Sequence, residues 1–503
     1  MAEGRAKKSI RNITYRMISQ VMSILLKFVS RSIFISILGV EYLGINGLFS
    51  EILQMLSLAD LGFNTAMVFS MYEPLAKKNE YKLAQLVMLY RKIYRIIAIT
   101  IFCLGLAITP FLQYLVKLDS EIPLLRVYYL LYLANTVASY LVVYKTCILT
   151  ADQKGYLLSK YDTFFSIAST IACCLFLYFT HNFLIYLIVQ VFFTYARNFY
   201  CSHVTTRLYP YISMKVDKIS QKESRGIFEN IKSVFVYKLA TTLVGSTDNT
   251  LISVMIGTVT VGLYSNYSMV ITNVTMFVNI LFSSVTASLG NLLVEANNEK
   301  NYSIYRSMQT ISFILSSFSV SCVYSLMNDF ISVWIGNEFL LDNMVLIAIV
   351  VNMYFSVVLM PIWSYREAAG LYRQTKYVMV VTAIVNLLLS IALGKIIGLA
   401  GILIATSIAR ISTYFWYEPK LLFKQYFSKS VIGYYVGIGL NILASAFVLI
   451  STSILFRNIS VNTWLQLLFK AMGIALVSIA LSILLYFRTN EFKKLISRFR
   501  FRH

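Results

Sequence analysis

Long apolar stretches alternate with short polar segments along the chain. Fourteen of these stretches are predicted as helices, because runs of this length can span a bilayer only as helices or closed barrels. They cover residues 13–38, 44–71, 93–116, 122–149, 157–179, 183–204, 228–256, 262–294, 307–328, 343–363, 376–395, 399–417, 431–455 and 464–487. Since one span needs about 20 residues, the pattern predicts an all-α polytopic membrane protein with about 14 transmembrane helices.

The most polar internal segment follows the sixth stretch and predicts a division of the chain into lobes. Residues 1–204 form the predicted N-lobe with helices 1–6, and residues 228–418 form the predicted C-lobe with helices 7–12. Residues 205–227 are the predicted cytoplasmic linker between the lobes. Residues 431–487 add helices 13 and 14, and residues 488–503 form a basic cytoplasmic tail.

Similar residues recur in the two predicted lobes at a constant separation. Gly39 and Gly44 in the first lobe are matched by Gly257 and Gly262 in the second, each 218 residues later. Six helices per repeat is an even number, so both repeats cross the membrane in the same direction. The predicted lobes are therefore related by a pseudo-two-fold axis along the membrane normal, as in transporters with parallel repeats.

The composition supports the membrane class. The 503 residues are 58% hydrophobic and 13% charged, with a mean hydropathy of +0.70. A soluble domain carries about 25% charged residues, so a soluble enzyme, a disordered chain and a secreted disulfide scaffold are excluded. The six cysteines lie within or beside apolar stretches without metal-ligand spacing. We predict no metal site, no cofactor and no catalytic residue.

The net charge of +22 arises from 44 lysines and arginines against 22 acidic residues. The basic residues concentrate in alternate polar segments, whereas Lys117, Lys395 and Arg457 are the ones in the predicted external loops. This asymmetry predicts that both termini are cytoplasmic. The positive charge is therefore explained by orientation in the membrane, and no nucleic-acid partner is predicted.

Cations within the first helix are the main candidates for substrate binding. Arg16, Lys27 and Arg31 lie within about 60° of one another on a helix of 3.6 residues per turn. Arg16 is compatible with snorkelling to the interface. Lys27 and Arg31 lie past the midplane, where a cation is costly and indicates either a hydrated cavity for anionic groups or a structural ion pair. Lys238 in helix 7 is a further candidate for the same cavity.

Three carboxylates are candidates for gating or ion coupling. Glu51 lies at about the depth of Arg31, and Asp60 lies nearer to Lys27, when helix 2 is counted at about 1.5 Å per residue. Glu51 and Asp60 point to opposite faces, so only one of them can pair with a straight helix 1. One is predicted to form an ion pair that opens during transport, and the other a proton or cation site. Asp248 in helix 7 is the third candidate.

Two segments resemble bacterial polysaccharide flippases of the Wzx type: Gly39-Val-Glu-Tyr-Leu-Gly-Ile-Asn-Gly-Leu-Phe-Ser50 and Leu56-Ser-Leu-Ala-Asp-Leu-Gly62. The run Tyr72-Glu-Pro-Leu-Ala76 and the turn Ala151-Asp-Gln-Lys154 are similar to that family too. The family belongs to the MOP superfamily, which includes the MATE drug exporters and the lipid II flippase. The resemblance implies two six-helix lobes, alternating access and a basic cavity for a lipid-linked saccharide.

The resemblance also implies a function. Polyprenyl-diphosphate-linked oligosaccharide repeat units would be moved from the cytoplasmic to the outer leaflet of the bacterial inner membrane, for a capsule or O-antigen. The implied partners are this substrate, membrane lipids, a polysaccharide polymerase and glycosyltransferases. Because the lipid II flippase has arginines on helix 1 in its cavity, Lys27 and Arg31 are the implied counterparts. Bidentate binding of phosphate then rests mainly on Arg31.

There are two alternative functions, one within the transporters and one in another class. A MATE-like drug or cation exporter is expected to have an acidic cavity, whereas the deep charges here are mainly basic. A membrane-embedded polysaccharide polymerase or glycosyltransferase is an enzyme, and it is expected to carry a sizeable external loop. The predicted external loops are all short. The sequence therefore favours a transporter that is not an enzyme.

Overall fold

The computed structural model describes residues 2–57, 67–68, 70–71, 74–75, 77–112, 122–152, 154–217, 219–220, 235–237, 239–245, 247–294, 298–489 and 491–493, without the side chains of 2–19, 284–288, 290–292 and 294. In this part of the chain every regular element is a helix. Contacts divide the chain into two compact units, Met1–Gly262 and Leu263–His503. The predicted division at 205–227 stays a prediction, since residues 221–234 lie outside the described residues.

Eight helices among the described residues are long and apolar enough to cross a membrane, and up to ten spans result if two bent pairs are included. This finding confirms the all-α polytopic membrane class, while the number of 14 stays a prediction. The first bend is 46°, between α5 (Leu125–Tyr140) and α6 (Val143–Ala151). The second is 42°, between α13 (Asn343–Val358) and α14 (Met360–Ala368). The residues that follow α5 and α13, Leu141 and Leu359, are again 218 positions apart.

Glycines break two of the long helices where the sequence predicts a helix boundary. α1 (Ala2–Leu56) contains the first predicted helix and the beginning of the second, and Gly39 between them has φ 83° and ψ −178°. A residue with a Cβ rarely adopts this φ, so a glycine is required at the break. In α15 (Tyr372–Ser412) the break lies at Ile397 and Gly398, between the stretches predicted at 376–395 and 399–417.

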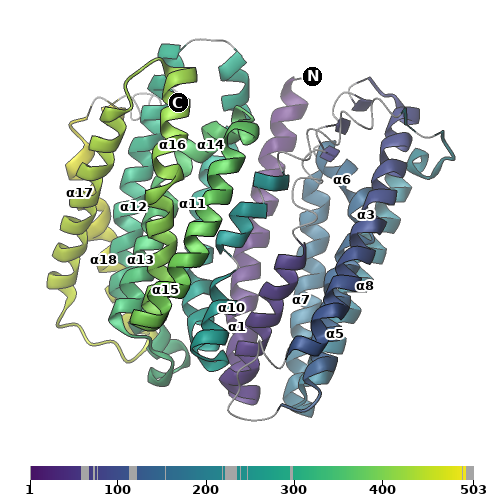
Figure 1. Ribbon diagram of the computed structural model, residues 1–503, viewed down its shortest axis with the longest axis horizontal. Coiled ribbons are helices and arrows are strands. Elements are labelled where there is room, and N and C mark those ends of the chain that lie inside the picture. Colours follow the sequence, from purple (N-terminus) through teal and green to yellow (C-terminus); the bar gives the residue numbers. More distant parts are fainter. Residues whose placement is uncertain are drawn as a thin grey trace. The chain divides into compact units, whose positions relative to one another are not determined.

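The first unit is a bundle in which α1 packs against several of the other helices. α1 contacts α7 (Gly155–Thr180), α7 contacts α8 (Phe183–Leu208), α8 contacts α5, and α5 contacts α3 (Glu80–Ile108) (Figure 1). Aromatic rings fill the space between them. The Phe183 ring of α8 lies 5.7 Å from Phe34 and 5.2 Å from Tyr42 of α1, and 4.8 Å from Tyr128 of α5. The unit also includes η2 (Thr109–Phe111), η3 (Pro210–Ser213) and α10 (Asp248–Met255).

The turn that contributes to the family resemblance, Ala151–Lys154, is held by a small polar cluster. Lys154 Nζ lies 2.7 Å from Asp152 Oδ2 and donates to the Tyr209 hydroxyl at 3.2 Å. The same hydroxyl donates to Asp152 Oδ2 at 2.7 Å. The ammonium also lies 5.0 Å from the centre of the Tyr209 ring. These contacts fasten the chain after α8 to the turn between α6 and α7.

A close helix crossing joins the second part of α1 to the beginning of α11 (Thr258–Val294). A Cβ on Gly44 would overlap the carbonyl oxygen of Thr258, and a Cβ on Gly262 would lie 2.7 Å from the carbonyl oxygen of Val40. Thr258 and Val40 are separated by the same 218 residues as the two glycines. The crossing is therefore reciprocal: Gly44 packs against Thr258, and the equivalent glycine, Gly262, packs against Val40, which is the equivalent of Thr258.

We expect Gly44→Ala to lower the thermal unfolding midpoint of the purified protein. The added methyl group meets backbone, which cannot move aside as a side chain can, and overpacking of this kind costs about 1–3 kcal/mol. Gly439→Ala is the matched control, because nothing lies within 4 Å of a Cβ at Gly439. An unchanged midpoint for Gly44→Ala would show that the crossing is not tightly packed.

The second unit is arranged around α12 (Asn298–Ile335). This helix packs against α13, α17 (Ile432–Phe456) and α18 (Trp464–Tyr486) (Figure 1). α15 packs against α13 and against α16 (Tyr414–Leu422). The unit is completed by η4 (Asn337–Phe339) and a π-helical turn, η5 (Phe423–Phe427). The predicted helices 13 and 14 thus correspond to α17 and α18.

Polar contacts centred on Asn441 join α17 to α12, α13 and α18. Asn441 of α17 accepts from Ser316 of α12 at 3.1 Å and from Tyr354 of α13 at 2.8 Å, and it donates to Tyr486 of α18 at 2.8 Å.

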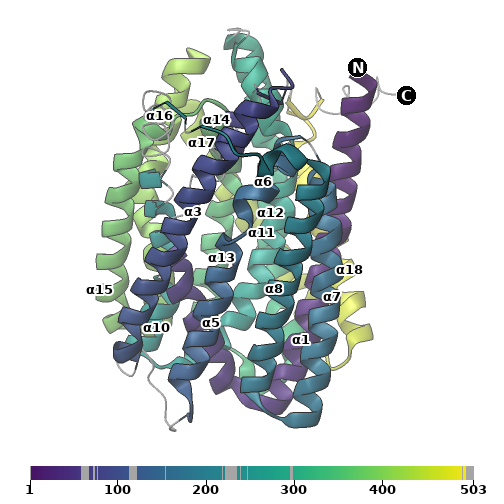
Figure 2. The same cartoon turned by 90° about the vertical axis from the view of Figure 1, so that its right-hand side faces the viewer.

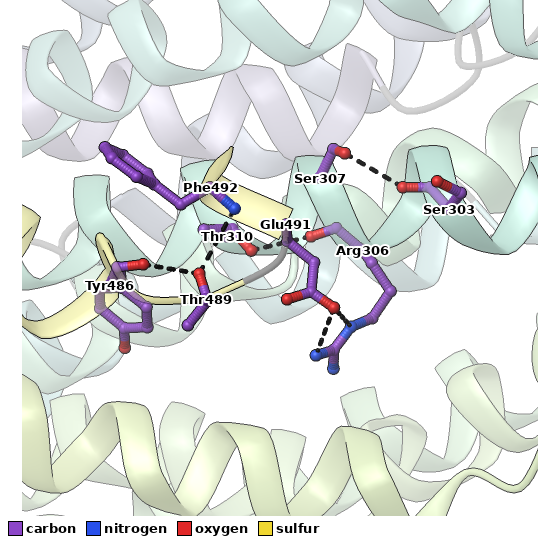
Figure 3. Close-up of polar contacts among 8 residues, drawn as sticks. All are labelled: Ser303, Arg306, Ser307, Thr310, Tyr486, Thr489, Glu491 and Phe492. Atoms are coloured by element: carbon purple, nitrogen blue, oxygen red, sulfur yellow. Dashed lines mark hydrogen bonds and ion pairs between the residues drawn. The ribbon is translucent and has the colours of Figure 1, made fainter. Parts of the chain in front are cut away.

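Beyond α18, Arg306 Nε and Nη2 donate to Glu491 Oε1 at 3.1 and 3.0 Å (Figure 3). The start of the predicted basic tail is therefore anchored on α12.

Candidate functional site

The cations of α1 differ in their surroundings although they lie one helical turn apart. The Lys27 side chain is exposed, and among the described residues it has no carboxylate partner. Arg31 is half-buried, and the group that acts on it electrostatically is Tyr186 of α8. The spacing of four residues places both on one face of α1. Lys27 is thus open to a ligand, whereas Arg31 is positioned by the protein.

Aromatic packing fixes the helical turn that carries Arg31. Phe34, which is 2% exposed, makes edge contacts with the rings of Phe183 and Tyr186 at 5.7 and 5.3 Å. Such pairs contribute about 0.5–1.5 kcal/mol beyond the burial of their area. Because Phe34 lies less than one turn from Arg31, these contacts hold the guanidinium at a defined place against α8.

Glu51 binds the beginning of α10 rather than a cation of helix 1. Its Oε2 accepts from the Asn249 backbone N–H at 3.2 Å, and its Oε1 accepts from Asn249 Nδ2 at 2.6 Å. The first N–H groups of a helix have no partner within the helix. The carboxyl group of Glu51 therefore caps α10 from a different helix, and it fastens the second part of α1 to α10.

A second acidic side chain lies at the same place. Asp248 is the first residue of α10, is 9% exposed, and acts electrostatically on Glu51. The two carboxyl groups share a mostly buried site at the beginning of one helix. The role of a proton or cation site, predicted for one of the acidic residues, stays a prediction.

The other predicted site residues are not placed. Lys238 and Asp60 lie outside the described residues, and so does the side chain of Arg16. Their roles stay predictions. Of the seven predicted residues, the structure brings together Lys27 with Arg31 on α1, and Glu51 with Asp248 at α10.

The sequence analysis missed two ion pairs of the second unit, one buried and one partly buried. Arg366 Nη1 of α14 donates to Glu418 Oε1 and Oε2 of α16 at 3.0 and 3.1 Å, and the side chains are 11% and 1% exposed. Lys470 Nζ of α18 lies 2.7 Å from Asp329 Oδ2 of α12. The only available signal was a charged residue near the end of an apolar stretch, which does not identify a partner.

Comparison with solved structures shows which proteins share this fold. The fold is similar to the lipid II flippase MurJ in an inward closed conformation, at a TM-score of 0.69 and 16% identity, covering 93% of this chain and 98% of that one. It is also similar to a multidrug resistance MATE family transporter of the MOP superfamily in an inward-facing conformation. That match has a TM-score of 0.60 and 15% identity, covering 80% and 97% of the two chains.

A third similar structure is a MOP superfamily transporter from Pyrococcus furiosus, described as having a binding pocket of reverse polarity. Its TM-score is 0.58 at 16% identity, with 84% of this chain and 97% of that chain covered. No curated protein sequence matches the chain. The apolar helices are those of a multi-pass membrane protein, and their fold is similar to the fold of these three structures.

A sequence family gives a more specific assignment than the fold does. Residues 9–287, more than half of the chain, match the family described as polysaccharide biosynthesis protein. The chain belongs to this family. The resemblance predicted from the sequence is therefore confirmed.

Proposed function

We propose that the protein is a flippase for polyprenyl-diphosphate-linked oligosaccharide repeat units. It moves them from the cytoplasmic to the outer leaflet of the bacterial inner membrane, with both termini cytoplasmic, and supplies surface polysaccharide assembly. The observation that carries the proposal is Lys27, an exposed cation in a membrane span without a carboxylate partner among the described residues. Membership of a polysaccharide biosynthesis family supports the saccharide part of the substrate.

Physical chemistry supports a cationic path for this substrate. A diphosphate carrying a polar saccharide cannot cross about 30 Å of hydrocarbon without help. A cationic, hydrated cavity removes most of that penalty, with Lys27 and Arg31 on one of its walls. The inside-negative potential favours outward movement by about 2.3 kcal/mol per negative charge per 100 mV. The membrane potential therefore contributes to transport even without a coupled ion.

We further propose that Glu51 and Asp248 form a gate in alternating access. Hydrogen bonds from Asn249 to Glu51 hold the second part of α1 against α10 in the state described here. Breaking these bonds separates the two helices, and a proton or cation at the carboxyl pair biases the equilibrium between the states. Asp60, Lys238 and Arg16 remain proposed members of the gate and the cavity.

The proposed function is tested by locating the lipid-linked saccharide. Polyprenyl-linked saccharides from cells that lack the protein are analysed by mass spectrometry, and a leaflet assay shows which side of the membrane holds them. We expect completed repeat units on the cytoplasmic leaflet, released by the wild type but not by Arg31→Ala. Lys27→Ala is expected to lower release at least tenfold, because an exposed phosphate contact of about 1.5–3 kcal/mol is lost.

The matched control is Lys395→Ala, which removes an exposed lysine of α15. It is expected to restore release as the wild type does. Normal polysaccharide export without a trapped intermediate in the deletion strain would contradict the flippase and favour a drug or cation exporter.

A further inference from the structure

A polar cluster in the first unit has no part in the proposed gate or cavity. Lys145 of α6 donates from Nζ to Ser202 Oγ at 3.0 Å and to Thr206 Oγ1 at 3.2 Å. Both partners are neutral hydroxyls on successive turns of α8. An ammonium group has three donors, so one N–H of Lys145 is left without a partner among the described residues. The two hydroxyls hold the ammonium in place and do not neutralise it.

The charged group next to this lysine is another cation. Arg91 of α3 acts electrostatically on Lys145, and its side chain is exposed. In the part of the chain that the structure describes, neither residue is paired with a carboxylate. Two neighbouring cations without a counter-charge repel each other, and an anion between them removes this repulsion. The cluster is thus built for an anionic ligand.

Exposed apolar side chains extend from the cluster along the same helix faces. On α8 they precede Ser202 and Thr206 at intervals of three and four residues, and they are between 43% and 79% exposed: Ile188, Phe192, Tyr195 and Phe199. On α3 Arg91 is followed on the same face by Arg95, which is also exposed, and then by apolar side chains that are 41% to 63% exposed: Ile99, Phe102 and Leu106. Residues at this spacing lie on one face of a helix.

The two exposed faces belong to α3 and α8, which are joined by the same pair of helices. α5 and α6 lie between α3 and α8 and contact both of them (Figure 2). The polar cluster lies near one end of this surface, since Thr206 is two residues from the end of α8 and Lys145 is six residues from the end of α6. The charge asymmetry predicts that this end is cytoplasmic. The polar cluster therefore lies at the depth of the lipid headgroups of the inner leaflet.

We propose that Lys145, Arg91 and Ser202 bind the phosphate of an anionic glycerophospholipid of the cytoplasmic leaflet. The acyl chains of this lipid lie along the exposed apolar faces of α3 and α8. The Ser202 hydroxyl accepts from Lys145 and keeps its own proton for a phosphate oxygen. A lipid fits better than free phosphate, because the apolar faces lead directly away from the cations. The inference does not rest on the identity of the translocated substrate.

The test measures binding of defined lipids to the purified full-length protein. Phosphatidylglycerol and phosphatidylcholine with identical acyl chains are compared by native mass spectrometry and by thermal unfolding. We expect selective binding of phosphatidylglycerol and a higher unfolding midpoint. Lys145→Gln and Arg91→Gln are each expected to weaken that binding about tenfold, the usual effect of losing one charge-assisted hydrogen bond. Lys395→Gln is the matched control and is expected to bind as the wild type does.

Glutamine at position 145 keeps a polar donor beside the hydroxyls of α8, and Arg91 is exposed, so these variants are expected to fold. Equal binding of phosphatidylglycerol by Lys145→Gln and the wild type would overturn the proposal. Equal stabilisation by inorganic phosphate would show that the acyl chains contribute nothing, and it would also overturn the proposal. Farnesyl diphosphate is the third probe: if its binding requires Lys145 and that of phosphatidylglycerol does not, the cluster is a substrate site instead. A failure of the flippase assay leaves all of these outcomes unaffected.

Discussion

Glu51→Ala is expected to reduce translocation at least tenfold while the protein remains in the membrane. The substitution leaves the backbone N–H and the Nδ2 of Asn249 without their acceptors. Each unsatisfied buried donor costs about 1–3 kcal/mol, and the cost falls on the state in which α1 and α10 are joined. The population of that state therefore decreases, and the cycle is slowed. Surface polysaccharide per unit of membrane-embedded protein is the measurement.

The substitution Glu51→Gln tests the contribution of the hydrogen bonds separately from that of the negative charge. The amide keeps one acceptor oxygen for Asn249 and cannot ionise. We expect a smaller loss of translocation than for Glu51→Ala if the contact holds the helices together. Wild-type rates for Glu51→Gln would show that ionisation of Glu51 is not needed, and wild-type rates for Glu51→Ala would refute the gate. Glu338→Ala, at an exposed residue of η4, is the matched control.

Arg366→Met is expected to lower the free energy of unfolding of the second unit by about 3–5 kcal/mol, because it leaves the carboxylate of Glu418 buried without its counter-charge. Glu418 is 1% exposed and both of its oxygens accept from Arg366. Thermal unfolding of the purified protein and the amount of protein in the membrane are the measurements. The double substitution Arg366→Met with Glu418→Leu is expected to restore most of the stability, since an apolar pair can replace a buried ion pair.

The matched control is an exposed ion pair of the same unit. Lys429 Nζ lies 2.6 Å from Glu299 Oε1, with side chains 42% and 77% exposed. Lys429→Ala is expected to leave the unfolding midpoint unchanged, because water screens such pairs. If Arg366→Met is as harmless as Lys429→Ala, the pair at α14 and α16 does not contribute to stability.

The helices were predictable because their signal is local. The apolar stretches at 157–179 and 431–455 match α7 and α17 to within two residues. The break at Gly39 was also predicted, since a glycine falls between two apolar stretches. The bends after α5 and α13 were not predicted, because an apolar stretch has the same composition whether the helix is straight or bent.

The partners of the site residues were not predictable in the same way. Counting along a straight helix gave only the depth of Glu51, about that of Arg31, whereas the structure shows that its partner is Asn249. That partner depends on the crossing of α1 with α11, which is set by packing between residues about 200 positions apart. The pairing of Arg366 with Glu418 is similarly non-local. The sequence identified the cations of α1 because a deep charge is recognisable without its partner.

The reciprocal crossing of Gly44 and Gly262 has the form of a contact in a symmetric homodimer. In such a dimer residue i of one subunit touches residue j of the other, and the reverse contact is identical. Here one chain contains both contacts, so its two sides need not be identical. Thr258 shares a hydrogen bond of 3.0 Å with Ser253, whereas its counterpart Val40 has no hydroxyl. The close approach of the two backbones is thus kept on both sides of the crossing, while the side chains around it differ.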